Sequence, residues 1–365
     1  MKLAGLLIAI LILSTATTVG ALPQFSYTMS YTFENRGSAV VTLQRDDASI
    51  PSFLQTSTQK ITLTGTNPTR AENWLDEDGN IFITLNTLLT INPGQKISFS
   101  ATYEIESHDQ QVPDITFQNA EYATKIPKNL IDQYTSSTTT FPSDDSEIHA
   151  LAERLVLSKT TVLEKVTSMV AWLDTNIAYD SIEIPRFAKE TMTEKKGDCD
   201  DQSILLISML RSVGIPAYME VGIILNSNFQ VTETSWDGHL TTQQNGVGWH
   251  GWAMVYIPPW GWTPVDLTYV NERTPLEMIQ KAPEYSGRIL RVFKVSNQDY
   301  VAMSRDTRER IIKQSIYVTT LDVATTTGTP FWLNPALLAL SGALLVSILV
   351  MFISARRTRV YAETL

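Results

Sequence analysis

One short stretch of the chain reads Lys196-Gly197-Asp198-Cys199-Asp200-Asp201. It contains the only cysteine among the 365 residues, so the chain has neither an internal disulfide nor a multi-cysteine zinc cluster. Apolar residues recur at helical spacing over 204–210, and Gly214 and Pro216 end that pattern. We therefore predict a helix that begins near Cys199. Gly197 allows a tight turn into it, and the free N–H groups of a helix start favour a thiolate.

Cys199 nevertheless lies among three aspartates. A lone cysteine is most often a small buried hydrophobe, and neighbouring negative charge disfavours a thiolate. A nucleophilic Cys199 therefore needs a cation beside it, and a histidine usually supplies it. Of the four histidines, His108 falls in a predicted loop and His149 on a predicted helix surface. We interpret both as surface residues.

His250 is the better partner. It begins a predicted strand, Trp249 to Tyr256, and a Pro-Pro-Trp-Gly turn at 258–261 leads to a second strand that reaches Asp266. Two antiparallel strands joined by this turn would place His250 and Asp266 side by side. One imidazole nitrogen could then face Cys199 while the other donates to Asp266, which is the logic of a catalytic triad.

Four segments together resemble the transglutaminase-like superfamily. They are Gly197–Ser203, Leu210–Ala217, His250–Trp252 and Asp266–Thr268. The resemblance covers about residues 145–270 and implies a papain-like core in which Cys199 is the nucleophile, His250 the base and then the acid, and Asp266 the residue that orients His250. Gly251 departs from the alanine that usually follows the histidine. Active members share acyl transfer through a thioester, whereas degenerate members are not enzymes.

Two metal sites deserve comparison with this interpretation. A Cys199–His239–His250 site matches no familiar ligand spacing. Asp198, Asp200 and Asp201 lack the twelve-residue pattern of a calcium loop, and they more simply form an acidic helix start. We therefore predict no metal and no cofactor, and we interpret Asp201 as a capping residue.

The N-terminal part of the chain has the pattern of half-buried strands. Apolar residues alternate with polar ones over 25–33, 81–85 and 97–105, and turn residues separate these runs. We predict a β-sandwich over residues 22–120 that acts as a spacer or a binding module. Helical periodicity begins near Ser143, and Thr161–Glu164 fits a capping box. The predicted second domain, residues 121–323, also contains strands near 218–225, 251–257, 261–267, 290–295 and 316–321 and a helix near 275–281.

The two ends of the chain predict export and anchoring. Residues 1–21 combine Lys2, an apolar run and a small-residue ending, which is typical of a cleaved signal peptide, although an uncleaved anchor stays open. Residues 336–354 are uncharged and long enough to span a membrane, and arginines follow them on the predicted inner side. We predict a stalk over 324–335, a transmembrane helix over 336–354 and a cytoplasmic tail over 355–365.

The predicted fold class is therefore α+β: an all-β sandwich, a transglutaminase-like (papain-like) domain and a C-terminal transmembrane helix. The net charge of −10, without a basic run, excludes a nucleic-acid partner. We predict a single-pass membrane protein whose catalytic domain lies outside the cytoplasm and acts on amide or peptide bonds of a protein or peptide. The alternative is an inactive binding or scaffold protein with the same fold.

Overall fold

The computed structural model of the protein describes residues 24–57, 59–87, 89–107, 112–269, 274–284 and 289–327. Phe25–Thr326 forms one compact unit, and a second unit groups Met1–Gln24 with Thr327–Leu365. The predicted signal segment, transmembrane helix, tail and most of the stalk lie outside the described residues, and so does His108. Among the helices that the structure describes, none combines the length and the apolar character needed to cross a membrane.

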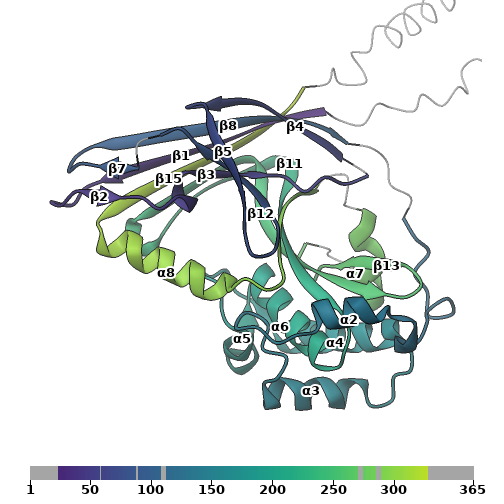
Figure 1. Ribbon diagram of the computed structural model, residues 1–365. Coiled ribbons are helices and arrows are strands. Elements are labelled where there is room, and N and C mark those ends of the chain that lie inside the picture. Colours follow the sequence, from purple (N-terminus) through teal and green to yellow (C-terminus); the bar gives the residue numbers. More distant parts are fainter. Residues whose placement is uncertain are drawn as a thin grey trace, which may run out of the picture. The chain divides into compact units, whose positions relative to one another are not determined.

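A large sheet of eight strands dominates the unit Phe25–Thr326 (Figure 1). Its order is β14-β11-β12-β15-β1-β8-β4, and β13 pairs with a further part of β12. The neighbours β12 and β15 run parallel, whereas β11 and β12 form a long antiparallel hairpin. The strands are β1 (Gln24–Asn35), β4 (Gln59–Asn67), β8 (Lys96–Ser107), β11 (Ala217–Ser235), β12 (Leu240–Ile257), β13 (Gly261–Val265), β14 (Ile289–Val295) and β15 (Ile316–Thr326).

The alternating N-terminal runs form strands as predicted. Tyr27 and Met29 of β1 and Phe99 and Tyr103 of β8 are buried in one core, because every second side chain of a strand points to the same face. Two smaller sheets complete this region. They are β3-β6-β5 and β2-β7, with β2 at Val41–Thr42, β3 at Ser49–Ser52, β5 at Arg70–Leu75, β6 at Ile81–Leu85 and β7 at Thr90–Ile91.

These strands do not form the self-contained sandwich that was predicted for residues 22–120. Strand β15, from the far end of the chain, lies between β1 and β12, and its register runs from Phe25↔Thr326 to Asn35↔Ile316. The core around Tyr27 also includes Ile223 of β11 and Leu290 of β14. Because β15 extends to Thr326, the first residues of the predicted stalk belong to the sheet.

Helices gather at one end of the β11–β12 hairpin (Figure 1). They are α2 (Lys128–Tyr134), α3 (Ser146–Val156), α4 (Val162–Asn176), α5 (Ala188–Glu194), α6 (Cys199–Ser212) and α7 (Pro275–Lys281), with the short strands β9 (Ala178–Tyr179) and β10 (Lys196–Gly197) between them. The predicted capping box at Thr161 and Glu164 is present at the start of α4. Helix α6 is buried along most of its length against β11 and β12.

Three helices, α2, α5 and α8 (Tyr300–Lys313), were not predicted, and α8 is the longest of them. Helix α8 precedes β15, and only Val301 and Ile311 of its side chains are buried. A helix with so narrow an apolar face gives a weak periodic signal, which explains why the sequence indicated only the helix at 275–281 in this region.

Candidate active site

The sheet divides at the middle of β12. This strand pairs with β15 up to Asn245 and with β13 from Ala253 onward. Between these points, over residues 246–252, β11 is its only neighbour among the strands that the structure describes. His250 lies in this stretch. Because no strand pairs with this part of β12 on the side opposite β11, α6 and the residues that follow β13 can approach it there.

Cys199 is the first residue of α6, as predicted, and Asp198 is the N-cap. Gly197 is required just before it, because a Cβ there would lie 2.7 Å from the Cβ of Asp201. Its carbonyl accepts a hydrogen bond from Gln202 Nε2 at 3.0 Å, which fixes the turn against the helix. The thiol is half-buried at a helix N-terminus, where the dipole favours a negative charge.

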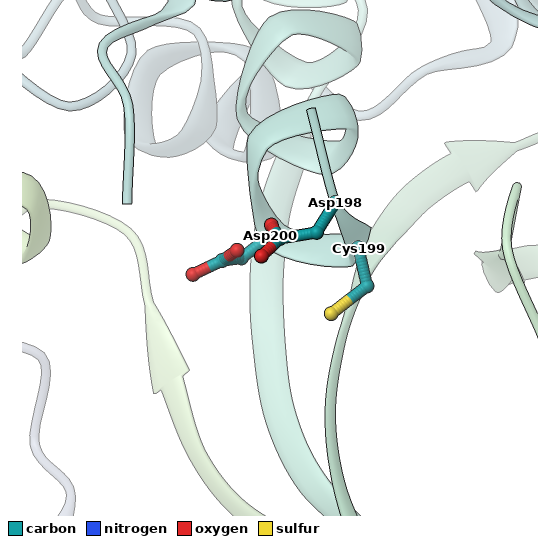
Figure 2. A group of neighbouring side chains, drawn as sticks. All are labelled: Asp198, Cys199 and Asp200. Carbon is teal, nitrogen blue, oxygen red and sulfur yellow. The ribbon is translucent and has the colours of Figure 1, made fainter. Parts of the chain in front are cut away.

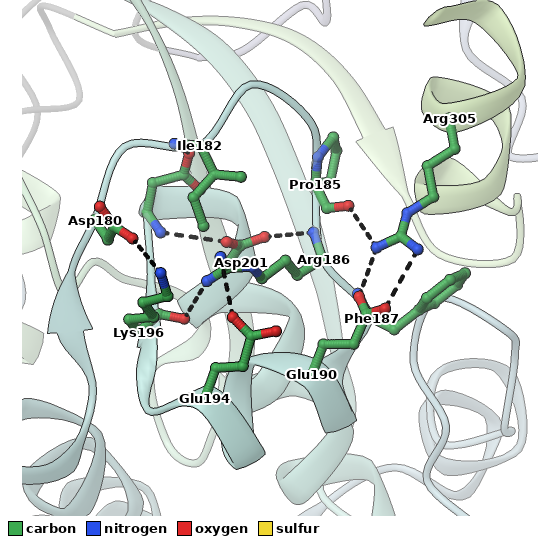
Figure 3. Close-up of polar contacts among 11 residues, drawn as sticks. Asp180, Ile182, Pro185, Arg186, Phe187, Glu190, Glu194, Lys196, Asp201 and Arg305 are labelled. Carbon is green, nitrogen blue, oxygen red and sulfur yellow. Dashed lines mark hydrogen bonds and ion pairs between the residues drawn. The ribbon is translucent and has the colours of Figure 1, made fainter. Parts of the chain in front are cut away.

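Asp201 supports this turn by hydrogen bonding, as predicted. Its carboxylate accepts the backbone N–H of Arg186 at 2.6 Å and that of Asp198 at 3.4 Å (Figure 3). Burial raises its pKa to about 6, although these backbone donors oppose the rise. The Arg186 side chain donates to the carbonyl of Lys196 at 2.9 Å. The segment before α5 is thereby tied to the start of α6.

Helix α8 holds the same segment from the other side. Arg305 pairs with Glu190 of α5 at 2.5 Å, and its guanidinium lies 4.6 Å from the ring centre of Phe187 (Figure 3). Helix α8 therefore helps to hold α5 and the segment before it, which are tied to the start of α6.

The structure brings His250 and Asp266 together. His250 Nε2 lies 2.6 Å from Asp266 Oδ2, and both side chains are buried. The register of β12 and β13, continued by one residue, places Asp266 opposite Trp252, so it reaches His250 diagonally instead of directly across the pair. Asp266 Oδ1 accepts the backbone N–H groups of Thr268 and Tyr269 at 3.0 and 3.1 Å. These bonds fix the carboxylate that orients the imidazole.

The electrostatics of this pair favour a charged imidazole. Burial lowers the pKa of His250, but Asp266 and the hydrogen-bonded Cys199 side chain outweigh it and raise that pKa to about 10. The pKa of Asp266 is lowered, because His250 and the backbone donors outweigh its burial. Since Nε2 faces Asp266, Nδ1 is the nitrogen left for the thiol. An imidazolium in this place supplies the cation that Cys199 needs among its acidic neighbours.

Asp198 and Asp200 flank the thiol (Figure 2). One ligand atom from each, together with Cys199 Sγ, lies within 4.8 Å of the others. This is the group of described residues with the spacing of a metal site, and His239 is not part of it. Burial, followed by the hydrogen bond with Asp198, raises the pKa of Asp200 well above its usual range. Tyr300 of α8 donates its hydroxyl to Asp200 Oδ2 at 3.0 Å.

The indole of Trp252 stacks on the imidazole of His250. Their ring centres are 6.0 Å apart, and the angle between their planes is 28°. Trp252 lies across the strand pair from Glu220, a buried carboxylate that Arg291 binds through two hydrogen bonds of 2.6 and 2.7 Å. Gly222, the cross-strand partner of His250, leaves room for the indole. The contact between Glu220 and Arg291 was not predicted, because nothing in the local sequence of either residue indicates that they meet.

Replacing Gly222 with alanine should disturb His250 through Trp252. The new Cβ would lie 2.4 Å from the carbonyl oxygen of Leu290 and 2.5 Å from Trp252 Cη2, so the strand or the indole has to move. We expect a loss of about 1–3 kcal/mol of unfolding free energy, measured by urea denaturation. Gly65→Ala is the matched control, because a Cβ at Gly65 meets nothing within 4 Å. Equal effects of the two substitutions would contradict this account.

The remaining predicted residues make their hydrogen bonds to other partners than the His250–Asp266 pair. His149 contacts the carbonyl of Ser212 at 3.1 Å on the surface of α3, as expected for a surface residue. His239 contacts the carbonyl of Ile316 at 2.8 Å and stacks on Tyr317 near the tip of the β11–β12 hairpin. Trp249 donates to Asp322 at 3.1 Å, away from Asp266, in agreement with the predicted alternation of Trp249 and His250.

Comparison with solved structures supports the fold. The structure of a candidate cysteine protease from Cytophaga hutchinsonii aligns with a TM-score of 0.52 and 16% identity, over 85% of this chain and 92% of that one. The periplasmic domain of TgpA from Pseudomonas aeruginosa aligns over 76% of this chain and 95% of that one, with a TM-score of 0.35 and 15% identity. The first similarity shows a shared fold, and the second is too low to add to it.

Sequence comparison covers a smaller part of the chain. The uncharacterized protein YebA of Bacillus subtilis (strain 168) is 25% identical over 207 residues, which is 49% of this chain. The match spans only 28% of the length of YebA. The family model described as "Transglutaminase-like superfamily" matches residues 149–267. This segment contains Cys199, His250 and Asp266. The chain therefore contains a transglutaminase-like domain over residues 149–267.

Proposed function

We propose that the protein is a cysteine enzyme that transfers the acyl group of an amide or peptide bond through a thioester. The observation that carries this proposal is the buried His250–Asp266 pair, 2.6 Å apart, beside a thiol at a helix start. An imidazolium with a pKa of about 10 both stabilises a neighbouring thiolate and has a proton to give to a leaving group.

The proposed reaction needs only these side chains and a water or an amine. Cys199 Sγ attacks the carbonyl carbon, and the backbone N–H of Cys199 is positioned to bind the developing oxyanion. His250 then protonates the leaving nitrogen, the C–N bond breaks and a thioester forms. A water or an amine, deprotonated by His250, attacks the thioester, and Sγ leaves as a thiolate. Asp266 keeps the imidazole oriented throughout.

Cys199→Ala should abolish amide turnover while the fold is retained, because the thiol is half-buried and makes few packing contacts that alanine lacks. Turnover is measured on an unfolded protein substrate by release of new amino groups, and in a second reaction by incorporation of a labelled primary amine. The two readouts separate hydrolysis from transfer, and circular dichroism checks the fold. Turnover that persists in Cys199→Ala would overturn the proposal and would leave the inactive binding protein as the better explanation.

We further propose that the domain works outside the cytoplasm, anchored by residues 336–354. The support is the sequence pattern of the two ends. Addition of a membrane-impermeant thiol reagent to intact cells should label Cys199, the only cysteine, if this placement is right. Labelling that requires lysis would contradict it.

A further inference from the structure

Two neighbouring cavities lie near the start of α6 and along α8. The inner cavity, about 450 Å³, is lined by Asp198 and Asp200 at the start of α6 and by loop residues 182–185. The outer cavity, about 570 Å³, lies between α8 and the small sheet β3-β6-β5. Phe293 and Tyr300 line both cavities, so the two spaces are neighbours. We call the two together the groove; Asp198 and Asp200, which flank the thiol, line its inner part.

The outer cavity has an aromatic and apolar surface. Trp74 and Phe82 stack with ring centres 4.9 Å apart, and Phe82 lies 6.4 Å from Phe293. Leu75 and Met303 also line this cavity, and 65% and 49% of their surfaces are exposed, respectively. Large exposed apolar side chains that line a cavity typically mark a binding surface.

Carboxyl side chains line both cavities, but the outer cavity also has Arg45 in its lining. Four carboxyl side chains line the inner cavity, and no lysine or arginine is among its described lining residues; the four are Glu183, Asp198, Asp200 and Asp322. Tyr300 lies against one of the two residues that flank the thiol, because its hydroxyl donates to Asp200 Oδ2 at 3.0 Å. A ligand in the inner cavity therefore meets carboxyl groups and no cation, a lining that offers an anionic side chain no partner of opposite charge.

We propose that this groove binds an extended segment of a protein substrate, with a bulky apolar side chain in the outer cavity and no acidic side chain near the reacting bond. The proposal rests on the proposed function, which requires an amide carbonyl at Cys199. A polypeptide continues on both sides of such a carbonyl, and the groove provides a surface for that continuation. The N-terminal strands and α8, which lie outside residues 149–267, would then contribute substrate specificity.

The test uses the single thiol of the full-length chain and needs no turnover. Iodoacetamide is compared with iodoacetyl peptides of about ten residues, roughly 33 Å when extended. One peptide carries phenylalanine and leucine in a glycine–serine background, and a second carries aspartates beside the reactive group. Each is made with the reactive group at either end, because the groove does not fix the direction of the chain. Alkylation of Cys199 is followed by mass spectrometry.

We expect the apolar peptide, in one of its two directions, to alkylate Cys199 with saturation and about tenfold faster than iodoacetamide, the effect of burying one large apolar side chain. The aspartate peptide should lose this gain. Leu75→Ser and Met303→Ser should also remove it and leave the iodoacetamide rate unchanged. Leu157→Ser is the matched control, since Leu157 is an 89% exposed leucine that does not line the groove.

The proposal is overturned if neither apolar peptide is faster than iodoacetamide, or if the gain survives in both groove variants. A gain that Leu157→Ser also removes would overturn it as well. Absence of amide turnover in the wild type would contradict the proposed function instead, because alkylation measures binding next to the thiol without requiring catalysis.

Discussion

Asp266→Asn is expected to lower the rate of acyl transfer by about ten-thousandfold, the order of loss that follows when the orienting carboxylate of a triad becomes an amide. Asp266 lies 2.6 Å from His250 Nε2 and is the main cause of the raised pKa of His250. An asparagine keeps the shape and can still accept the two backbone N–H groups, but it no longer stabilises an imidazolium. The thiol then loses its cationic partner.

Two measurements check this expectation. One is turnover of the unfolded protein substrate, and the other is the rate at which iodoacetamide alkylates Cys199 between pH 6 and pH 9. We expect the alkylation rate at pH 6 to fall at least about tenfold, because only the thiolate reacts at a useful rate. Asp78→Asn is the matched control, since Asp78 is another buried carboxylate with backbone donors, from Ser296 at 2.7 Å and Asn297 at 2.8 Å. An unchanged pH profile in Asp266→Asn would show that this carboxylate does not control the thiol.

The second large expected effect concerns His250: the free energy of unfolding should depend on pH. The native protein holds the His250 proton up to about pH 10, whereas an unfolded histidine releases it near pH 6.5. Between these values the native state binds more protons than the unfolded state, so the stabilisation is complete below pH 6.5 and is lost as the pH rises toward 10. The loss should approach about 1.4 kcal/mol per pH unit.

Urea denaturation at pH 6.5 and pH 9 measures this slope, with all proteins compared in a Cys199→Ala background so that no thiolate offsets the His250 proton. His250→Gln should flatten it, because the titrating group is gone, although the variant is less stable at pH 6.5 for lack of a partner to Asp266. His149→Gln offers the same substitution at a half-exposed histidine on α3, and we expect it to keep the slope of the wild type. A slope that is the same in all three proteins would contradict the imidazolium assignment.

The sequence indicated the local elements of the site correctly. The start of α6 at Cys199 follows from a glycine, an aspartate and a helical apolar pattern within a few residues of one another. The same holds for the capping box at Thr161, whose two hydrogen-bonding partners are three residues apart. His250 and Asp266 were paired correctly because a short turn connects their strands, although the contact is diagonal.

Contacts between distant segments could not be read in this way. The alternation of β1 shows which of its faces is buried, but every amphipathic strand has the same pattern, so it does not identify β15 as the neighbour. That pairing joins residues about three hundred positions apart and places β1, β4 and β8 in the same sheet as β11 and β12. The contact of Tyr300 with Asp200 and that of Glu220 with Arg291 arise for the same reason.

By itself, the sequence determined the chemistry that is available: one thiol at a helix start, one histidine and one aspartate on a hairpin, and an acidic surrounding. Only the tertiary structure decided what surrounds this chemistry. Helix α8 and the strands β3, β5 and β6 come together around the outer cavity, and β15 returns along β1. The physical reason is that a turn or a cap depends on neighbours along the chain, whereas sheet order and cavities depend on which distant apolar faces bury one another.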